Sequence, residues 1–336
     1  MYREFYKLDR DPFSLSPDPY FFYLTHQHRE ALSGLVYATC THPGLTVLVG
    51  EVGSGKTMLL YTLRALLQKR SFSLAFCVNP TYSPTEFYDF LLHALGVECS
   101  STLKSRQLIA LEEKLLRNRA EGKRTVLIVD EAQRLSMNVL EEVRLLLNLE
   151  TPREKLLEII MAGQQELSDF LQKPELRQLK QRVSFCCKLN PLSRQELAEY
   201  VHHRLMRSGQ PNSTIFPPTT LDLIYRKTKG IPRLVNTLCD NSLRIGFAMQ
   251  SLQVTVPIIQ EAASDLSLLT GLSDESQEPP AIVESEVLSE PTTLNTALRN
   301  ENAMNGNGIT GRIPMESYAA RQKSFGLFGS LMDRWR

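Results

Sequence analysis

The sequence predicts an α/β fold with a parallel five-stranded sheet, followed by an all-helical module and a disordered C-terminal tail. A glycine-rich loop at residues 50–57 joins an apolar strand to a helix. Continuous apolar strands then alternate with helical patterns as far as residue 189, and from about residue 268 small and polar residues dominate. Strands that are apolar throughout are typical of parallel sheets covered on both faces. A segment poor in large apolar side chains cannot offset its chain entropy.

The composition is that of an ordinary soluble protein, and the length suits about two domains. The 336 residues are 42% hydrophobic and 22% charged. The six cysteines include no C-x-x-C pair, which suits a reducing compartment. The N-terminus lacks the apolar core of a secretory signal, and no run reaches the roughly 18 apolar residues that span a bilayer. We therefore expect a cytoplasmic protein.

The net charge of +1 conceals an asymmetry. Residues 261–336 contain eleven acidic and six basic side chains, so the residues before them carry a mild positive excess. Such an excess permits contact with nucleic acid but does not argue for it strongly.

The helices and strands follow an aromatic, proline-rich N-terminal segment. Residues 1–25 are expected to be extended and to wrap the domain, because proline excludes regular helix. Their aromatic side chains either pack in the core, the commoner role, or line a ligand pocket. Apolar periodicity predicts strands at 45–49, 73–78, 124–131, 157–162 and 182–189. It predicts helices at 28–39, 58–67, 84–95, 104–119, 137–149, 193–207, 220–227 and 232–249.

The loop after the first strand fits the phosphate-binding pattern G-x-x-x-x-G-K-[ST], with the strand before it and the helix after it that this motif requires. Its backbone N–H groups and the positive end of the helix are expected to hold phosphates. Lys56 would reach the β- and γ-phosphate oxygens, and the Thr57 hydroxyl would ligate Mg²⁺. The residues expected to bind ATP are Gly50, Glu51, Val52, Gly53, Ser54, Gly55, Lys56, Thr57 and Met58.

Acidic and polar side chains follow two later strands. Asp130 and Glu131 close the third strand, at the edge where open α/β sheets bind ligands. Asp130 is expected to orient the Mg²⁺ shell and Glu131 to polarise the attacking water. Gln164 follows the fourth strand, where it either contacts the γ-phosphate or the water, or serves as a spacer in a turn.

Two sets of arginines are candidates for contact with the phosphates. Arg233 lies at the start of a helix, where the macrodipole disfavours a cation, and this mismatch favours a functional role. It would couple the helical module to the nucleotide. Arg182 or Arg177 would act on a neighbouring subunit as an arginine finger, with Arg182 slightly favoured. Ordinary solvated arginines are the alternative for this second set.

Two further features of the sequence bear on ligand binding. The pairs His26/His28 and His202/His203 lack i,i+4 spacing and an accompanying cysteine cluster, so they do not predict a metal site. Residues 321–336 form a short cationic amphipathic segment that includes Trp335, the single tryptophan. It suits reversible attachment to a membrane surface or docking onto a partner protein.

With these motifs in place, the chain resembles the ExeA/GspA-type branch of the AAA+ ATPases over about residues 1–265. The stretches that carry the resemblance are MYREFYKLDRDPFSLSPDPYFFYLTHQHREAL, GLTVLVGEVGSGKT, TVLIVDEAQRL, LEEVRLLLNLET, AGQQEL, LRQLKQRV and GIPRLVN. The resemblance implies an AAA+ core with the N-terminal segment at 1–190 and a helical lid at 191–267, in which Arg233 is the sensor-2 arginine. An acidic linker at 268–320 and the amphipathic segment at 321–336 would follow.

The family implies an ATPase that hydrolyses ATP with Mg²⁺ to drive or regulate assembly of a membrane-associated machine for secretion, pilus formation or exopolysaccharide export. A homo-oligomer, inner-membrane assembly proteins as partners and peripheral membrane contact through residues 321–336 are expected. Secretion members also carry a transmembrane helix and a peptidoglycan-binding region that this sequence lacks, so no periplasmic role is expected. The alternatives are a DNA-dependent ATPase regulator of the transposition type and a signalling module whose bound nucleotide fixes its shape.

Overall fold

The computed structural model describes residues 1–41, 44–211 and 214–270. These residues belong to one compact unit of the chain. The predicted linker at 268–320 lies outside them except for residues 268–270, which are helical. The predicted amphipathic segment at 321–336 lies wholly outside them. No helix among the described residues combines the length and the apolar character needed to cross a membrane.

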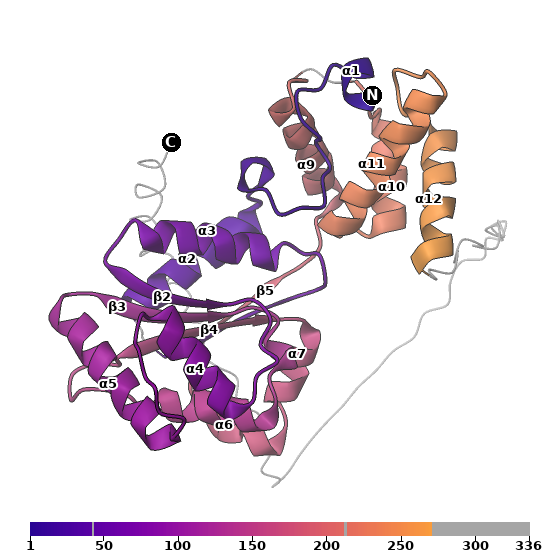
Figure 1. The fold of residues 1–336 in the computed structure, drawn as a ribbon. Coiled ribbons are helices and arrows are strands. Elements are labelled where there is room, and N and C mark those ends of the chain that lie inside the picture. Colours follow the sequence, from indigo (N-terminus) through magenta and orange to yellow (C-terminus); the bar gives the residue numbers. More distant parts are fainter. Residues whose placement is uncertain (42–43, 212–213, 271–336) are drawn as a thin grey trace, which may run out of the picture. The chain divides into compact units, whose positions relative to one another are not determined.

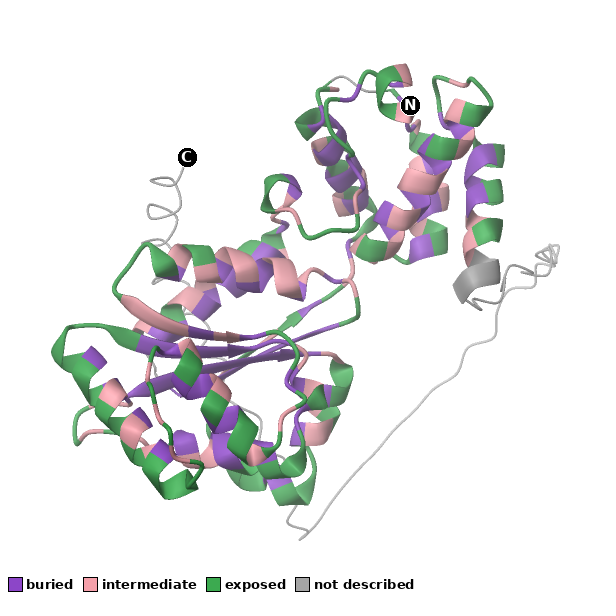
Figure 2. Cartoon of the chain, viewed as in Figure 1, coloured by how far each residue is buried: buried purple, intermediate pink, exposed green. Residues whose placement is uncertain are grey.

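A five-stranded sheet with the order β2-β3-β4-β1-β5 is the centre of the fold, and every pairing is parallel. This confirms the predicted sheet. The strands are β1 (Leu45–Gly50), β2 (Phe72–Cys77), β3 (Arg124–Val129), β4 (Leu157–Gly163) and β5 (Val183–Leu189). Every residue of β1 and β4 is buried, as the purple strands of Figure 2 show. Burial on both faces explains why these strands are apolar without alternation.

Helices cover both faces of the sheet (Figure 1). On one face lie α2 (His26–Thr41) and α3 (Lys56–Gln68). The other face carries α4 (Pro84–Ala94), α5 (Lys104–Ala120), α6 (Met137–Leu146) and α7 (Gln165–Leu171). Two 3₁₀ turns lie between these elements, η2 (Ala132–Arg134) before α6 and η3 (Pro174–Leu176) after α7, and η3 leads into the four-residue helix α8 (Arg177–Lys180). The side chains of the second face form one apolar cluster with Val47, Val49 and their neighbours on the strands.

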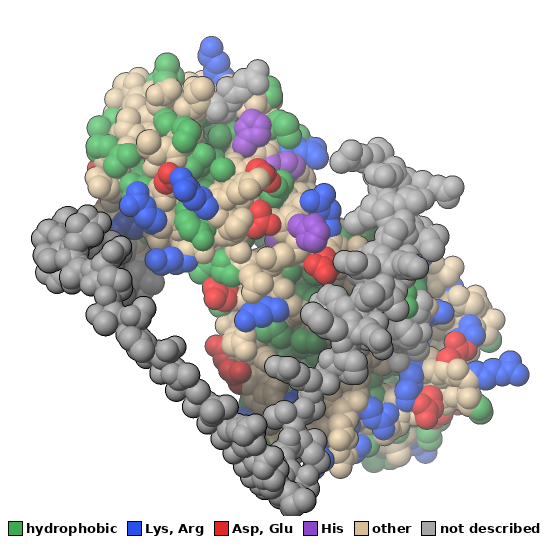
Figure 3. All heavy atoms as spheres, turned by 180° about the vertical axis from the view of Figure 1, so that it is seen from behind, with side chains coloured by type: hydrophobic (Ala, Val, Ile, Leu, Met, Phe, Trp, Pro, Cys, Tyr) green, Lys and Arg blue, Asp and Glu red, His purple; other side chains and the backbone are tan. Residues whose placement is uncertain are grey.

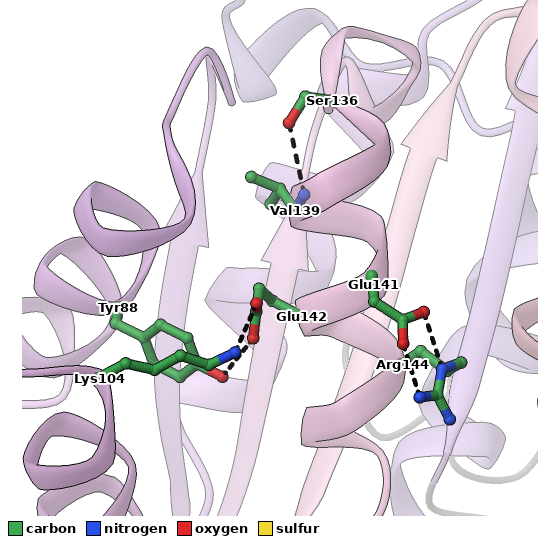
Figure 4. A network of polar contacts seen from close by, with 7 residues as sticks. All are labelled: Tyr88, Lys104, Ser136, Val139, Glu141, Glu142 and Arg144. Carbon is green, nitrogen blue, oxygen red and sulfur yellow. Dashed lines mark hydrogen bonds and ion pairs between the residues drawn. The ribbon is translucent and has the colours of Figure 1, made fainter.

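A polar network ties three helices of that second face together (Figure 4). Glu142 of α6 is buried, and it accepts a hydrogen bond of 3.0 Å from the Tyr88 hydroxyl of α4. Lys104 of α5 donates to the other carboxylate oxygen at 2.7 Å. The start of α6 is capped by Ser136, whose hydroxyl accepts the N–H of Val139 at 3.3 Å. Because Glu142 is paired and hydrogen-bonded, its burial is compensated.

The remaining helices form the predicted all-helical module around a second apolar cluster. They are α9 (Arg194–Arg207), α10 (Pro218–Thr228), α11 (Pro232–Ala248) and α12 (Val256–Thr270). Helix α12 was not predicted. Tyr6, Leu8 and Phe13 of the N-terminal segment lie in this cluster. The segment therefore packs on the helical module, where most of its aromatics take the core role.

The prediction of a fully extended N-terminal segment is wrong at two places. Helix α1 (Tyr2–Phe5) precedes the prolines, and a single 3₁₀ turn, η1, spans Pro19–Phe21. Proline is compatible with the first position of such a turn because its missing N–H would have no partner there. The Asp18 side chain caps the turn by accepting the N–H of Tyr20 at 2.9 Å.

Candidate nucleotide-binding site

The phosphate-binding loop runs from the end of β1 to the first turn of α3, as its sequence pattern predicts. Gly53 and Gly55 have φ angles of +79° and +97°, which side chains with a Cβ rarely adopt. The first turn of α3 leaves backbone N–H groups without acceptors inside the helix. The Ser54 hydroxyl oxygen is buried and has no hydrogen-bond partner in the described part of the chain. A loop with free N–H donors at a helix start fits an anion such as phosphate.

Lys56 lies folded against the loop that precedes it. Its side chain is buried, and Nζ donates to the carbonyl oxygens of Gly50 and Glu51 at 2.8 Å each. Burial lowers the pKa of the Lys56 ammonium, and the charges of Glu131 and Asp130 oppose that shift. A buried cation beside neutral carbonyl partners suits a site that receives an anion.

Thr57 and Asp130 are joined across the site. The Thr57 hydroxyl donates to Asp130 Oδ2 at 2.6 Å, and the Glu131 N–H donates to Oδ1 at 2.9 Å. Burial raises the pKa of the Asp130 carboxyl, while these two hydrogen bonds lower it. Hydroxyl and carboxylate oxygens are the ligands that Mg²⁺ prefers, so this pair fits the metal that the fold implies. Among the described residues, no cluster of three or more histidine, cysteine, aspartate or glutamate side chains could hold a metal ion.

Glu131 occupies a strained backbone position beside the loop. Its φ and ψ are 53° and 38°, in the left-handed region that residues other than glycine seldom adopt. Its Oε2 accepts from Gln133 Nε2 at 2.5 Å and from Gln164 Nε2 at 3.2 Å. Strain of this kind is typical of functional sites.

Gln133 belongs to this group, although none of the sequence motifs predicts it. Besides donating to Glu131, its Oε1 accepts the backbone N–H of Gln164 at 3.2 Å. A Cβ at Gly163 would come within 2.7 Å of that Oε1, so the glycine at the end of β4 makes room for the glutamine. Gln133 therefore contacts both the Glu131 carboxylate and the backbone of Gln164, whose own side chain also donates to Glu131. The signal for Gln133 was its position two residues after Glu131.

Arg233 reaches the loop from the helical module. Its N–H donates to the Gly53 carbonyl at 3.3 Å. A Cβ at Gly53 would lie 2.5 Å from Arg233 Cβ, so the helix start and the loop are in direct contact. The Arg233 side chain is exposed and lines the same pocket as Lys56 and Glu131.

That pocket, of about 290 Å³, is also lined by the N-terminal segment and by α9. Phe22 and Tyr23 line the pocket, which was one of the two alternatives for the N-terminal aromatic residues. His28 and Arg204, which the sequence did not single out for this site, line it too. Arg204 is buried between the rings of Phe21 and Tyr200, at 5.4 and 5.1 Å from their centroids.

Arg182 lies away from this pocket. It precedes β5, whose pairing with β1 runs from Leu45 and Val183 to Gly50 and Leu189. The loop follows the opposite end of β1, about 20 Å along the strand. Arg182 Nη2 donates to Asn148 Oδ1 at 2.9 Å, and its side chain is exposed. Arg177, at the start of α8, is exposed as well.

Comparison with known proteins shows what the chain is similar to. The family described as "AAA domain" matches residues 39–171. General secretion pathway protein A of Aeromonas hydrophila is 39% identical over 280 residues, which are 82% of this chain and 50% of that protein. The chain thus spans about half the length of this relative.

Solved structures share the fold at low sequence identity. The Drosophila ORC bound to DNA is 20% identical with a TM-score of 0.62, covering 81% of this chain and 69% of that one. Cdc6p from Pyrobaculum aerophilum is 16% identical with a TM-score of 0.60, covering 78% and 74%. At these identities the likeness concerns the fold alone. Fold, loop and sequence relationship together place the chain in the AAA+ proteins, in the ExeA/GspA-type branch.

Proposed function

We propose that this protein binds ATP with Mg²⁺ and hydrolyses it to drive or regulate the assembly of a membrane-associated machine. The observation that carries the proposal is that side chains from three elements meet at the phosphate-binding loop, joined by hydrogen bonds. Lys56 and Thr57 begin α3, Asp130 and Glu131 follow β3, and Gln164 follows β4. Phosphoryl transfer needs a cation, a metal site and a group that orients water, and these side chains supply one of each.

In this proposal each residue has a separate task. The loop residues 50–58 bind the phosphates, with Lys56 turning from the loop carbonyls towards them. Thr57 and Asp130 would hold Mg²⁺, which neutralises phosphate charge when bound. Glu131 accepts a proton from the attacking water. Gln133 and Gln164 hold the Glu131 carboxylate in place. Arg233 contacts the phosphates and thereby couples the position of the helical module to the bound nucleotide.

The biological setting rests on the relative and on the sequence. The relative's name refers to the general secretion pathway, which supports secretion over the pilus and exopolysaccharide settings. In this proposal the protein is a homo-oligomer that lies in the cytoplasm at the membrane. Its partners are inner-membrane assembly proteins. A role for residues 321–336 in membrane contact is part of it. Flotation of the full chain with liposomes, compared with a chain ending at Ala320, tests that role, and equal flotation contradicts it.

The test of activity is ATP turnover by the purified full chain with Mg²⁺, with and without duplex DNA. We expect turnover above background that DNA does not change. On the face that Figure 3 shows, lysine and arginine side chains are scattered among acidic ones rather than gathered in a stripe. Stimulation by DNA that falls steeply with salt would support the transposition-type alternative. Turnover equal to background would support the signalling module.

A further inference from the structure

His28 of α2 lies directly beneath the phosphate-binding loop. It is 5% exposed, and its Nε2 is 3.3 Å from the carbonyl oxygen of Ser54. A Cβ at Gly55 would come within 3.1 Å of that nitrogen. Phe22 packs against the ring edge-on, with centroids 5.5 Å apart. The imidazole is therefore held against one peptide of the loop, between Ser54 and Gly55.

The hydrogen bonds define the tautomer of this imidazole. A carbonyl oxygen only accepts, so Nε2 carries the proton that is donated to Ser54. Nδ1 then accepts from the Thr25 hydroxyl, whose oxygen lies 2.7 Å away. Thr25 Oγ1 also accepts the backbone N–H of His28 at 3.2 Å, which caps the start of α2. Burial lowers the pKa of His28 and favours the neutral ring. The hydrogen bond to the Ser54 carbonyl and the charge of Glu196 raise this pKa and partly oppose the effect of burial.

A peptide unit is planar and trans, so its C=O and N–H point in opposite directions. Holding the Ser54 carbonyl on the His28 side therefore directs the Gly55 N–H to the other side. Gly55 adopts its left-handed conformation next to the first turn of α3, where N–H groups collect anions. We propose that His28 is a positioning residue for nucleotide binding, because its Nε2–H aims the Gly55 N–H at the bound phosphates. The inference rests on the proposed ATP binding.

The test compares two amide substitutions of His28. His28→Gln places an amide N–H near the position of Nε2 and keeps the donor to Ser54, whereas His28→Asn carries its amide only near Nδ1. The matched control is His26→Gln, because the His26 side chain is 85% exposed two residues earlier. For each protein, dissociation constants for MgADP and for adenosine would be measured by calorimetry or competition, together with the unfolding midpoint.

We expect His28→Asn to weaken MgADP binding about tenfold or more, the usual range for a lost hydrogen bond to a charged group. Adenosine binding should not change, because it has no phosphate. His28→Gln and His26→Gln should stay within about threefold of wild type. MgADP affinity that is unchanged in His28→Asn overturns the inference, and so does an equal loss for MgADP and adenosine. A wild-type chain that binds no nucleotide overturns the proposed function instead.

Should His28→Asn not fold, the hydroxyl of Thr25 offers a second route. Thr25→Val removes the donor to His28 Nδ1, so the proton on the ring is no longer restricted to Nε2. Thr25→Ser keeps the hydroxyl and therefore the donor. We expect the valine variant to lose MgADP affinity relative to the serine variant, again with adenosine unaffected. Equal MgADP affinities of these two variants overturn the inference.

Discussion

The hydroxyl of Thr57 lies 2.6 Å from a carboxylate oxygen of Asp130, although 73 positions separate the two residues in the chain. One residue starts α3 and the other follows β3, so the contact exists only because β1 and β3 end at the same edge of a parallel sheet. The adjacent backbone N–H of Glu131 holds the second oxygen of the same carboxylate. The site is therefore a consequence of sheet topology.

Replacing Lys56 by methionine should strongly weaken nucleotide binding without unfolding the protein. The ammonium is buried and its pKa is lowered by that burial, so the folded chain gains little from its charge when no phosphate is bound. We expect MgATP affinity to fall on the order of 100-fold, as for the loss of charge-assisted hydrogen bonds. Calorimetric titration measures it, with the exposed Lys123→Met as control. A thermal midpoint far below wild type would show that Lys56 is mainly structural.

Replacing Gln133 by methionine should slow ATP turnover with little change in KM. Gln133 donates to Glu131 and accepts from the Gln164 backbone, so its loss removes one of the two side-chain donors to the carboxylate and leaves the phosphate loop unchanged. A decrease in kcat of about tenfold is expected for a residue that orients a general base. Steady-state kinetics would be compared with Gln165→Met, whose side chain is exposed. A rise in KM at constant kcat would assign Gln133 to binding.

Mixing an Arg182→Ala chain with a Lys56→Met chain should test whether Arg182 acts on a neighbouring subunit. Arg182→Ala keeps an intact phosphate loop, and Lys56→Met keeps Arg182. If Arg182 acts between subunits, mixed assemblies contain complete sites, and turnover should exceed that of either variant alone. Arg177→Ala should behave like wild type. If Arg182→Ala is fully active and Arg177→Ala instead regains turnover when mixed with Lys56→Met, the arginine finger is Arg177.

Glu158 of β4 should make stability depend on pH. It is 3% exposed, and it accepts hydrogen bonds from the Gly44 N–H and, at 3.0 Å, from the Thr46 hydroxyl. Burial raises the pKa of Glu158 to about 8 from 4.5. The folded chain therefore holds a proton between these values that the unfolded chain releases. Its unfolding free energy should fall as pH rises through this window, by up to about 1.4 kcal/mol per pH unit.

Glu158→Gln removes that titration, since an amide stays neutral. Denaturant titrations at several pH values should show that the unfolding free energy of the variant depends less on pH than that of wild type between about pH 4.5 and 8. Near pH 8 the variant should be more stable than wild type. Parallel profiles for the two proteins would mean that the carboxyl does not titrate in this range.

Contiguous patterns allowed much of this molecule to be predicted. The phosphate loop and the Asp130-Glu131 pair are short motifs whose geometry is local, and the five strands are apolar runs that burial on both faces requires. Gln164 was placed at the site because strand ends meet at one edge of a parallel sheet.

What escaped prediction depends on contacts between distant segments. Nothing near His28 in the sequence indicates that Ser54 lies against it, and the cation–π packing of Arg204 needs Phe21 from another segment. The prolines concealed η1, because the proline rule excludes helix interiors but not first turns. Helix α1 has only four residues, too few to show a helical period.

Glu131→Gln offers the most direct test of the central claim, that this pocket binds ATP and that Glu131 activates the water. The measurement is retention of labelled ATP with Mg²⁺ together with release of labelled phosphate in a single turnover. We expect the variant to retain ATP as well as wild type and to release phosphate at least about 100-fold more slowly. Phosphate release at the wild-type rate, or failure of the wild-type chain to retain ATP, would contradict it.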